Sequence, residues 1–157
     1  MKIIRILSTM GLKNGKEALG LLRQLRKAGG TNIQIADLTK NSFKVNCNLT
    51  NNREPSSFLF DFARNRQQHT TKFSRVALLP WDQRSKGTIT EVANLSSGRP
   101  LKTVTHSTET INSQIKLEKT TINNHVTGTT LERHIKPDGT IEYYRQRENG
   151  PLERLFA

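Results

Sequence analysis

The stretch NGKEALGLLRQLRKAGG, residues 14–30, has the clearest local structure in the sequence. Its alanine and leucine residues recur at steps of three and four, which places them on one side of an α-helix as a core-facing stripe. The stripe consists of Ala18, Leu21, Leu22, Leu25 and Ala28. The sequence therefore predicts an amphipathic helix as the best-defined element of the N-terminal half.

Both ends of this helix carry recognisable end signals. Asn14 is a good N-cap residue, and Glu17 stands three positions further on, as in a capping box. Gly29 and Gly30 permit the left-handed backbone conformation that closes many helices. We therefore expect the helix to begin after Asn14 and to end before Gly29.

The opposite side of the helix is basic. Lys16, Arg23 and Lys27 share a row that passes through Gly20, and Arg26 lies beside it. One interpretation is a solvated surface that keeps the chain soluble, and the other is a face that contacts phosphates. A helix lying on a membrane is the weakest interpretation, because its apolar side lacks Trp and Phe.

The charge of the chain is concentrated in its first half. The 157 residues suffice for one compact domain, and 33% are hydrophobic. The formal net charge is +12, but residues 1–86 hold 16 Lys and Arg against 5 Asp and Glu, whereas residues 87–157 hold 9 against 8. A field of this strength favours a polyanion partner, with nucleic acid first and acidic lipid second.

Cysteine and histidine usage argues against disulfides and metal sites. Cys47 is the only cysteine, so the chain has no intramolecular disulfide, and a reduced, intracellular, cytoplasmic location is expected. Organelle import is the alternative, because the first sixteen residues contain no acid. Three of the four histidines are not spaced as metal ligands usually are, so no metal or cofactor is predicted; they are His69, His106 and His125. No stretch is long and apolar enough to insert into a membrane.

The pattern of apolar residues predicts an α+β fold with two halves. Strands are expected at residues 2–8, 31–38, 43–49 and 75–79, a turn at 51–55 and a short second helix at 56–69. Residues 1–80 would form a basic half that begins strand–helix–strand, residues 81–87 a linker or hinge, and residues 88–157 an antiparallel β-rich half packed against the first. The boundary rests on the turn-forming residues after Pro80 and on the change in charge.

The best-defined pair of strands surrounds Pro137, Asp138 and Gly139. A type I turn followed by a left-handed residue fits these three residues and would pair Lys136 with Thr140. The register that follows opposes His134 to Glu142, Glu132 to Tyr144, Ile135 to Ile141, and Arg133 to Tyr143.

A histidine beside two carboxylates supports one catalytic hypothesis. His134, Glu132 and Glu142, with Arg145 nearby, supply a base, an acid and a cation, the minimum for metal-independent RNA cleavage. A cross-strand His–Glu pair is more often an ordinary stabilising contact. Because no other catalytic motif is present, enzymatic activity has little support.

The function that the sequence favours is non-enzymatic binding of nucleic acid, with RNA slightly ahead of DNA because no major-groove reading motif is visible. Two phenylalanines near the basic residues, Phe60 and Phe73, are candidates for stacking on bases. One alternative is a self-associating structural protein, viral or phage-like, and another is a small RNase or toxin centred on His134. The predicted phosphate contacts are Lys16, Arg23, Arg26, Lys27, Arg64, Arg66, Lys72 and Arg75.

Overall fold

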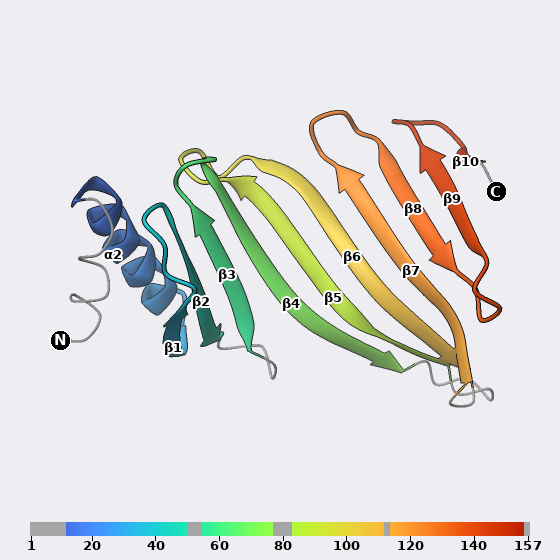
Figure 1. Ribbon diagram of the computed structural model, residues 1–157, viewed down its shortest axis with the longest axis horizontal. Coiled ribbons are helices and arrows are strands. Elements are labelled where there is room, and N and C mark those ends of the chain that lie inside the picture. Colours follow the sequence, from blue (N-terminus) through green and yellow to red (C-terminus); the bar gives the residue numbers. More distant parts are fainter. Residues whose placement is uncertain (1–11, 50–54, 77–82, 112–113, 156–157) are drawn as a thin grey trace. The chain divides into compact units, whose positions relative to one another are not determined.

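The computed structural model describes residues 12–49, 55–76, 83–111 and 114–155, and these form one helix and ten strands. The strands are hydrogen-bonded in chain order, β1 to β10, in one sheet (Figure 1). The elements are α2 (Leu12–Lys27), β1 (Thr31–Ala36), β2 (Ser42–Asn48), β3 (Ser56–Asp61), β4 (Arg66–Val76), β5 (Gln83–Asn94), β6 (Pro100–Ile111), β7 (Gln114–Asn124), β8 (Thr130–Ile135), β9 (Ile141–Gln146) and β10 (Leu152–Arg154). The pairings within β1–β4 and within β6–β10 are antiparallel, so the coarse α+β expectation holds.

The chain divides into two compact units. The first unit comprises residues 1–70 and 93–99, and the second comprises residues 71–92 and 100–157. The division therefore falls within β4 and β5 and differs from the predicted halves. Residues 83–87, predicted as part of a linker, form the beginning of β5.

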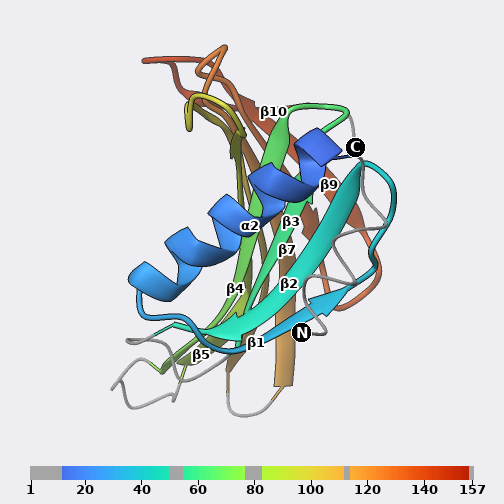
Figure 2. The same ribbon diagram turned by 90° about the vertical axis from the view of Figure 1, so that its left-hand side faces the viewer.

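The hydrophobic core of the first unit lies between α2 and the sheet, and Figure 2 shows the helix lying across the strands. The helix contributes Ala18, Leu22 and Leu25, all buried, as the stripe predicted. Leu21 is half-buried, and Ala28 is exposed beyond the end of the helix. The facing side chains on the strands are Phe43, Val45, Cys47 and Phe60.

The two ends of α2 differ in how well the sequence predicted them. The Gly29 N–H donates to the Arg26 carbonyl (3.0 Å) and the Gly30 N–H to the Leu25 carbonyl (2.8 Å), with Gly29 at φ 90°. These two bonds form a Schellman motif, so the predicted C-cap is confirmed. The N-cap prediction is wrong, because the helix begins at Leu12 and Asn14 lies inside it.

The Asn14 side chain serves a different contact. Its amide nitrogen approaches the Lys40 carbonyl (3.5 Å) and the Asn41 side-chain oxygen (3.4 Å). Both acceptors belong to the connection between β1 and β2. Asn14 therefore links the helix to a neighbouring turn instead of capping its own backbone.

Strand β2 follows the predicted alternation. Phe43, Val45 and Cys47 are buried, while the residues between them are half-buried. Burial raises the pKa of the Cys47 thiol, which fits a core residue and not a reactive one. Strand β1 pairs antiparallel with β2, and the strand predicted at residues 2–8 lies outside the described residues.

The second helix, predicted at residues 56–69, is wrong. These residues form β3, a turn and the beginning of β4. Phe58 and Phe60 are two residues apart and share one face of a strand, where Phe60 opposes Phe43 with ring centroids 5.0 Å apart. Burial of Phe60 beside β2 outweighs the weak helical spacing of this segment.

The second unit contains the predicted antiparallel meander. In the last long hairpin, β8 and β9 pair His134 with Glu142, Glu132 with Tyr144, Ile135 with Ile141, and Arg133 with Tyr143, so the predicted register is confirmed. The Lys136 N–H donates to the Thr140 carbonyl at 2.9 Å, and Gly139 has φ 87°. The turn chemistry therefore sets the register.

Two hairpin turns, thirty residues apart, are built in the same way. Asn94 accepts the N–H groups of the second and third residues after it through its side-chain oxygen (3.1 and 3.0 Å), and Asn124 does the same (2.9 and 3.2 Å). Four residues after each asparagine, Gly98 and Gly128 both have φ 73°. The β5–β6 and β7–β8 hairpins thus share an asparagine–glycine turn.

The glycines of α2 and its C-cap give a paired stability prediction. Gly29→Ala should destabilise the protein by roughly 1–2 kcal/mol, because a side chain is strained at positive φ. Gly20→Ala should stabilise it by about 1 kcal/mol, because Gly20 is inside the helix and a Cβ there would meet nothing within 4 Å. Urea unfolding followed by circular dichroism measures both, and equal signs for the two variants would contradict the helix boundaries.

Candidate functional site

The predicted phosphate-binding residues on α2 form an accessible cationic surface. Lys16, Arg23, Arg26 and Lys27 are all exposed. Among the described residues, no carboxylate lies within ion-pair distance of any of them. The core stripe fixes the rotation of the helix, so the same spacing that buries the leucines turns the cations outward.

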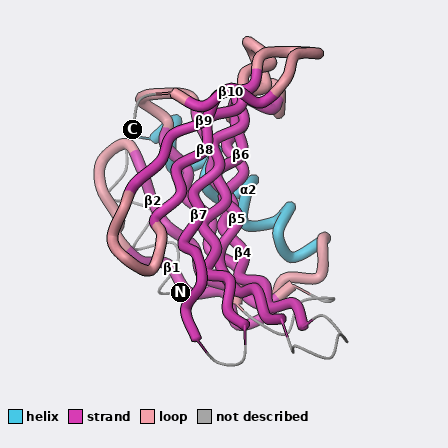
Figure 3. The backbone as a smooth tube through the Cα atoms, turned by 90° about the vertical axis from the view of Figure 1, so that its right-hand side faces the viewer, coloured by secondary structure: helices cyan, strands magenta, loops and turns pink. Residues whose placement is uncertain are grey.

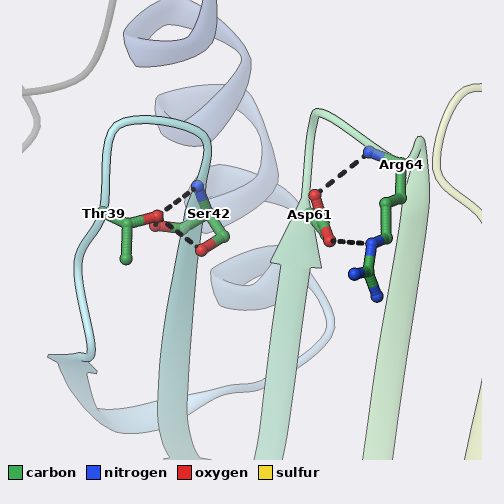
Figure 4. A network of polar contacts seen from close by, with 4 residues as sticks. All are labelled: Thr39, Ser42, Asp61 and Arg64. Carbon is green, nitrogen blue, oxygen red and sulfur yellow. Dashed lines mark hydrogen bonds and ion pairs between the residues drawn. The ribbon is translucent and has the colours of Figure 1, made fainter.

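Arg64 lies in the turn between β3 and β4 and is partly neutralised. Its N–H donates to Asp61 Oδ1 (3.1 Å), and its guanidinium Nε is 3.8 Å from Asp61 Oδ2, as Figure 4 shows. The Arg64 side chain remains 79% exposed. A second turn in the same view, between β1 and β2, is closed by the Ser42 N–H donating to Thr39 Oγ1 at 3.0 Å.

Arg66 lies on the face of the sheet that α2 does not cover. Register places Phe60 opposite Gln67 and Asp61 opposite Arg66, and successive strand residues alternate between faces. Because Phe60 packs under the helix, Arg66 points away from it. Lys44, between the buried Phe43 and Val45, shares that uncovered face and was not among the predicted residues.

Lys72 and Arg75 belong to the second unit and are exposed. The Arg75 guanidinium carbon lies 5.5 Å from the centroid of the Phe73 ring, a cation–π distance. Phe60 is 2% exposed and cannot stack on a base, so that candidate is wrong. Of the six predicted cations in the first unit, four lie on α2, Arg64 lies in a turn, and Arg66 lies on the uncovered sheet face.

A groove of about 340 Å³ runs beside the basic row of α2. It belongs entirely to the first unit, which holds 13 Lys and Arg against 4 Asp and Glu. The helix and the β3–β4 and β5–β6 turns supply its walls. The lining residues, which we call the helix groove, are Glu17, Gly20, Leu21, Gln24, Phe62, Asn65, Leu95 and Ser96. Sequence reasoning missed it because its walls come from three separated segments.

Three of the catalytic candidates of the C-terminal hairpin, His134, Glu132 and Glu142, lie on one face of the second unit, where β7, β8 and β9 run side by side (Figure 3). His134 Nε2 is 3.0 Å from Glu132 Oε2, and its ring is 4.7 Å from that of Tyr144. Lys119 Nζ lies 3.7 Å from the other oxygen of Glu132. Both His134 and Glu132 are thus engaged with neighbours.

Glu142 is the most enclosed member of this polar cluster, with 6% exposure. Lys136 Nζ approaches its carboxylate at 2.7 Å, Arg154 at 3.5 Å, and the Tyr144 hydroxyl donates a short hydrogen bond to it. Two hydrogen bonds hold the pKa of Glu142 below its ordinary value, with the larger effect from Lys136 and the smaller from Tyr144. The Glu142 carboxylate in turn raises the pKa of Lys136. Glu142 is therefore a stable carboxylate near neutral pH, which suits an ion-pair partner and not a general acid.

Arg145 is not part of this cluster. It opposes Leu131, which places it on the other face of the sheet, where its guanidinium is 3.5 Å from Glu153. The predicted combination of His134 with Arg145 is therefore wrong. The described residues also contain no group of three or more His, Cys, Asp and Glu side chains that could hold a metal ion.

Comparison with known proteins adds no assignment. No family model, curated protein or solved structure matches this chain. Among the described residues, no helix is long and apolar enough to cross a membrane.

The ion pairs of Glu142 give a prediction for acid stability. A carboxyl whose pKa is lowered by folding stabilises the folded state above the unfolded value of about 4.3, and this contribution is lost as pH falls through the lower, folded pKa. Between about pH 6 and pH 3, the urea midpoint should fall further for the natural protein than for Glu142→Gln. Glu91→Gln, at an exposed site on β5, is the control and should keep the full acid dependence. An unchanged slope in Glu142→Gln would contradict this account.

Proposed function

We propose that this protein binds nucleic acid without catalysing a reaction, and that Lys16, Arg23 and Lys27 of α2 contact the phosphates. The observation that carries the proposal is the exposed row of cations that lacks carboxylate partners among the described residues. The row from Lys16 to Lys27 extends over about three helical turns, or roughly 16 Å, a length that matches several backbone phosphates. The excess charge of the first unit adds a long-range attraction.

RNA is favoured over DNA by the surroundings of the row. In the part of the chain that the structure describes, no second helix accompanies α2 to make a helix–turn–helix motif. Single-stranded RNA presents flexible phosphates and unstacked bases, which suit a row of cations beside a groove. Arg64 directly precedes Asn65, which lines the groove, and its exposed side chain would add a cation beside the row on α2.

Charge reversal on α2 tests the proposal. Arg23→Glu/Lys27→Glu should weaken RNA binding by at least about tenfold at low salt and reduce the slope of log affinity against log salt, because two phosphate contacts are lost. The matched control is Lys102→Glu/Lys116→Glu, which makes the same change in net charge at exposed sites of the second unit and should bind nearly as well as the natural protein. Fluorescence anisotropy with labelled RNA, duplex DNA and heparin provides the measurement.

Three results would contradict the proposal. They are an absence of binding at low salt, a shallow salt slope, and equal losses in the helix variant and its control. Binding to heparin as tight as binding to RNA would show that charge alone is recognised.

A second candidate function, self-association, is favoured by an exposed apolar face in the second unit. Ile122 and Leu131 oppose each other on one face of β7 and β8, and Ile141 and Tyr143 share that face through their pairing with β8. Their exposures are 38%, 43%, 41% and 45%. The opposite face, with Glu132, His134 and Glu142, is the more buried one, the reverse of an ordinary half-buried sheet.

This inverted pattern predicts that a second copy of the chain covers the apolar face. Light scattering after size exclusion should give a mass above that of one chain, and Leu131→Glu should return it to the monomer mass. The new carboxylate would lie opposite Arg145 on β9, and the attraction between opposite charges should limit the loss of stability in the strand pairing. Val126→Glu, in the β7–β8 turn, is the control and should not change the mass. A monomer for the natural protein at all concentrations would exclude assembly through this face.

A further inference from the structure

The helix groove has apolar walls that come from three parts of the first unit. Leu21 lies on α2, Phe62 in the β3–β4 turn and Leu95 in the β5–β6 turn. All three are half-buried, so each presents apolar surface to the groove while packing against the core. Apolar side chains placed in this way can pack against the face of an aromatic ring.

The two turns that form the far wall are braced against each other. The Asn65 amide donates to Asn94 Oδ1 (3.2 Å) and Ser96 Oγ (3.1 Å), and the Ser96 N–H donates to Asn65 Oδ1 (3.0 Å). The Leu95 N–H donates to the Asn65 carbonyl at 2.9 Å. The groove is therefore formed before any ligand arrives, which lowers the entropic cost of binding.

Gly20 marks the point where the groove meets the cationic row. It lies on α2 between Lys16 and Arg23, and it lines the groove. A Cβ added at Gly20 would meet nothing within 4 Å, so close packing inside the protein does not require glycine here. A glycine inside a helix lowers stability, and it leaves the backbone open to close approach by a ligand.

The helix side of the groove carries two polar groups that can read a ligand. The Gln24 side chain has no hydrogen-bond partner among the described residues and offers both a donor and an acceptor. Glu17, seven residues earlier on the same side of α2, is exposed and offers only acceptors when ionised. Together they favour a ring that carries an amino group.

From these observations we infer that the helix groove holds one unstacked base of single-stranded RNA, with preference for a base that has an exocyclic amino group. The inference rests on the proposed function and assigns a role to residues that phosphate binding does not use. The base lies between Leu21, Phe62 and Leu95, its amino group donates to Glu17, and Gln24 completes the contact. The phosphates on either side of it lie on the row of Lys16, Arg23 and Lys27, which passes through Gly20.

Filling the groove tests this inference without changing the charge of the protein. The experiment compares fluorescence anisotropy of oligo(C), oligo(U) and an abasic RNA backbone of equal length, about ten nucleotides, with the natural protein, Gly20→Leu and Gly20→Ala. Stacking and hydrogen bonding of one base should make oligo(C) bind roughly tenfold more tightly than the abasic strand. Gly20→Leu should lower oligo(C) binding to the abasic level while leaving the salt slope unchanged.

The alanine variant controls for helix stability. Gly20→Ala stabilises α2 in the same way as Gly20→Leu but fills less of the groove, so it should retain most of the preference for oligo(C). Glu17→Gln should bring oligo(C) and oligo(U) closer together, because the amide can accept from one base and donate to the other.

The outcomes separate this inference from the proposed function. If the natural protein binds the abasic strand as tightly as oligo(C), or if Gly20→Leu keeps the base preference, the groove is not a base site and phosphate binding by α2 still stands. If the natural protein binds none of the three strands at low salt, both the proposed function and the base site are wrong.

Discussion

The burial of one side of α2 against β2 and β3 is the interaction on which the first unit depends. Of the described hydrophobic residues that are buried, all except Val92 belong to this contact. The stripe of Ala18, Leu22 and Leu25 also decides which way the helix is rotated. The rotation of this sixteen-residue helix therefore determines both which residues are buried and which cations are exposed. A substitution that weakened the packing of the leucines would also displace the cations.

The second unit is held together differently. Among its described residues, Val92 is the one buried hydrophobic side chain. Hydrogen-bonded strands and a polar cluster around Glu142 take the place of a hydrophobic core. A carboxylate in that position is stabilised by its partners, and removal of one partner would leave a poorly solvated charge. The apolar side chains lie on the opposite face, so the hydrophobic effect favours an additional layer over that face.

The sequence predicted those features that depend on local chemistry. The register of β8 and β9 follows from the turn at Pro137–Asp–Gly139, and the end of α2 follows from Gly29 and Gly30. Residues 56–69 were misassigned because their phenylalanines fit two periodicities, and only the partner strand β2 selects one. The face occupied by Arg66 and the composition of the helix groove depend on long-range pairing, which no single segment encodes.

The shared turn of the β5–β6 and β7–β8 hairpins suggests how such a chain changes in length. Each hairpin turn is closed by its own asparagine side chain and has a glycine at positive φ four residues later. Tandem duplication or loss of a segment of about thirty residues that carries one such hairpin would lengthen or shorten the sheet stepwise, two strands at a time.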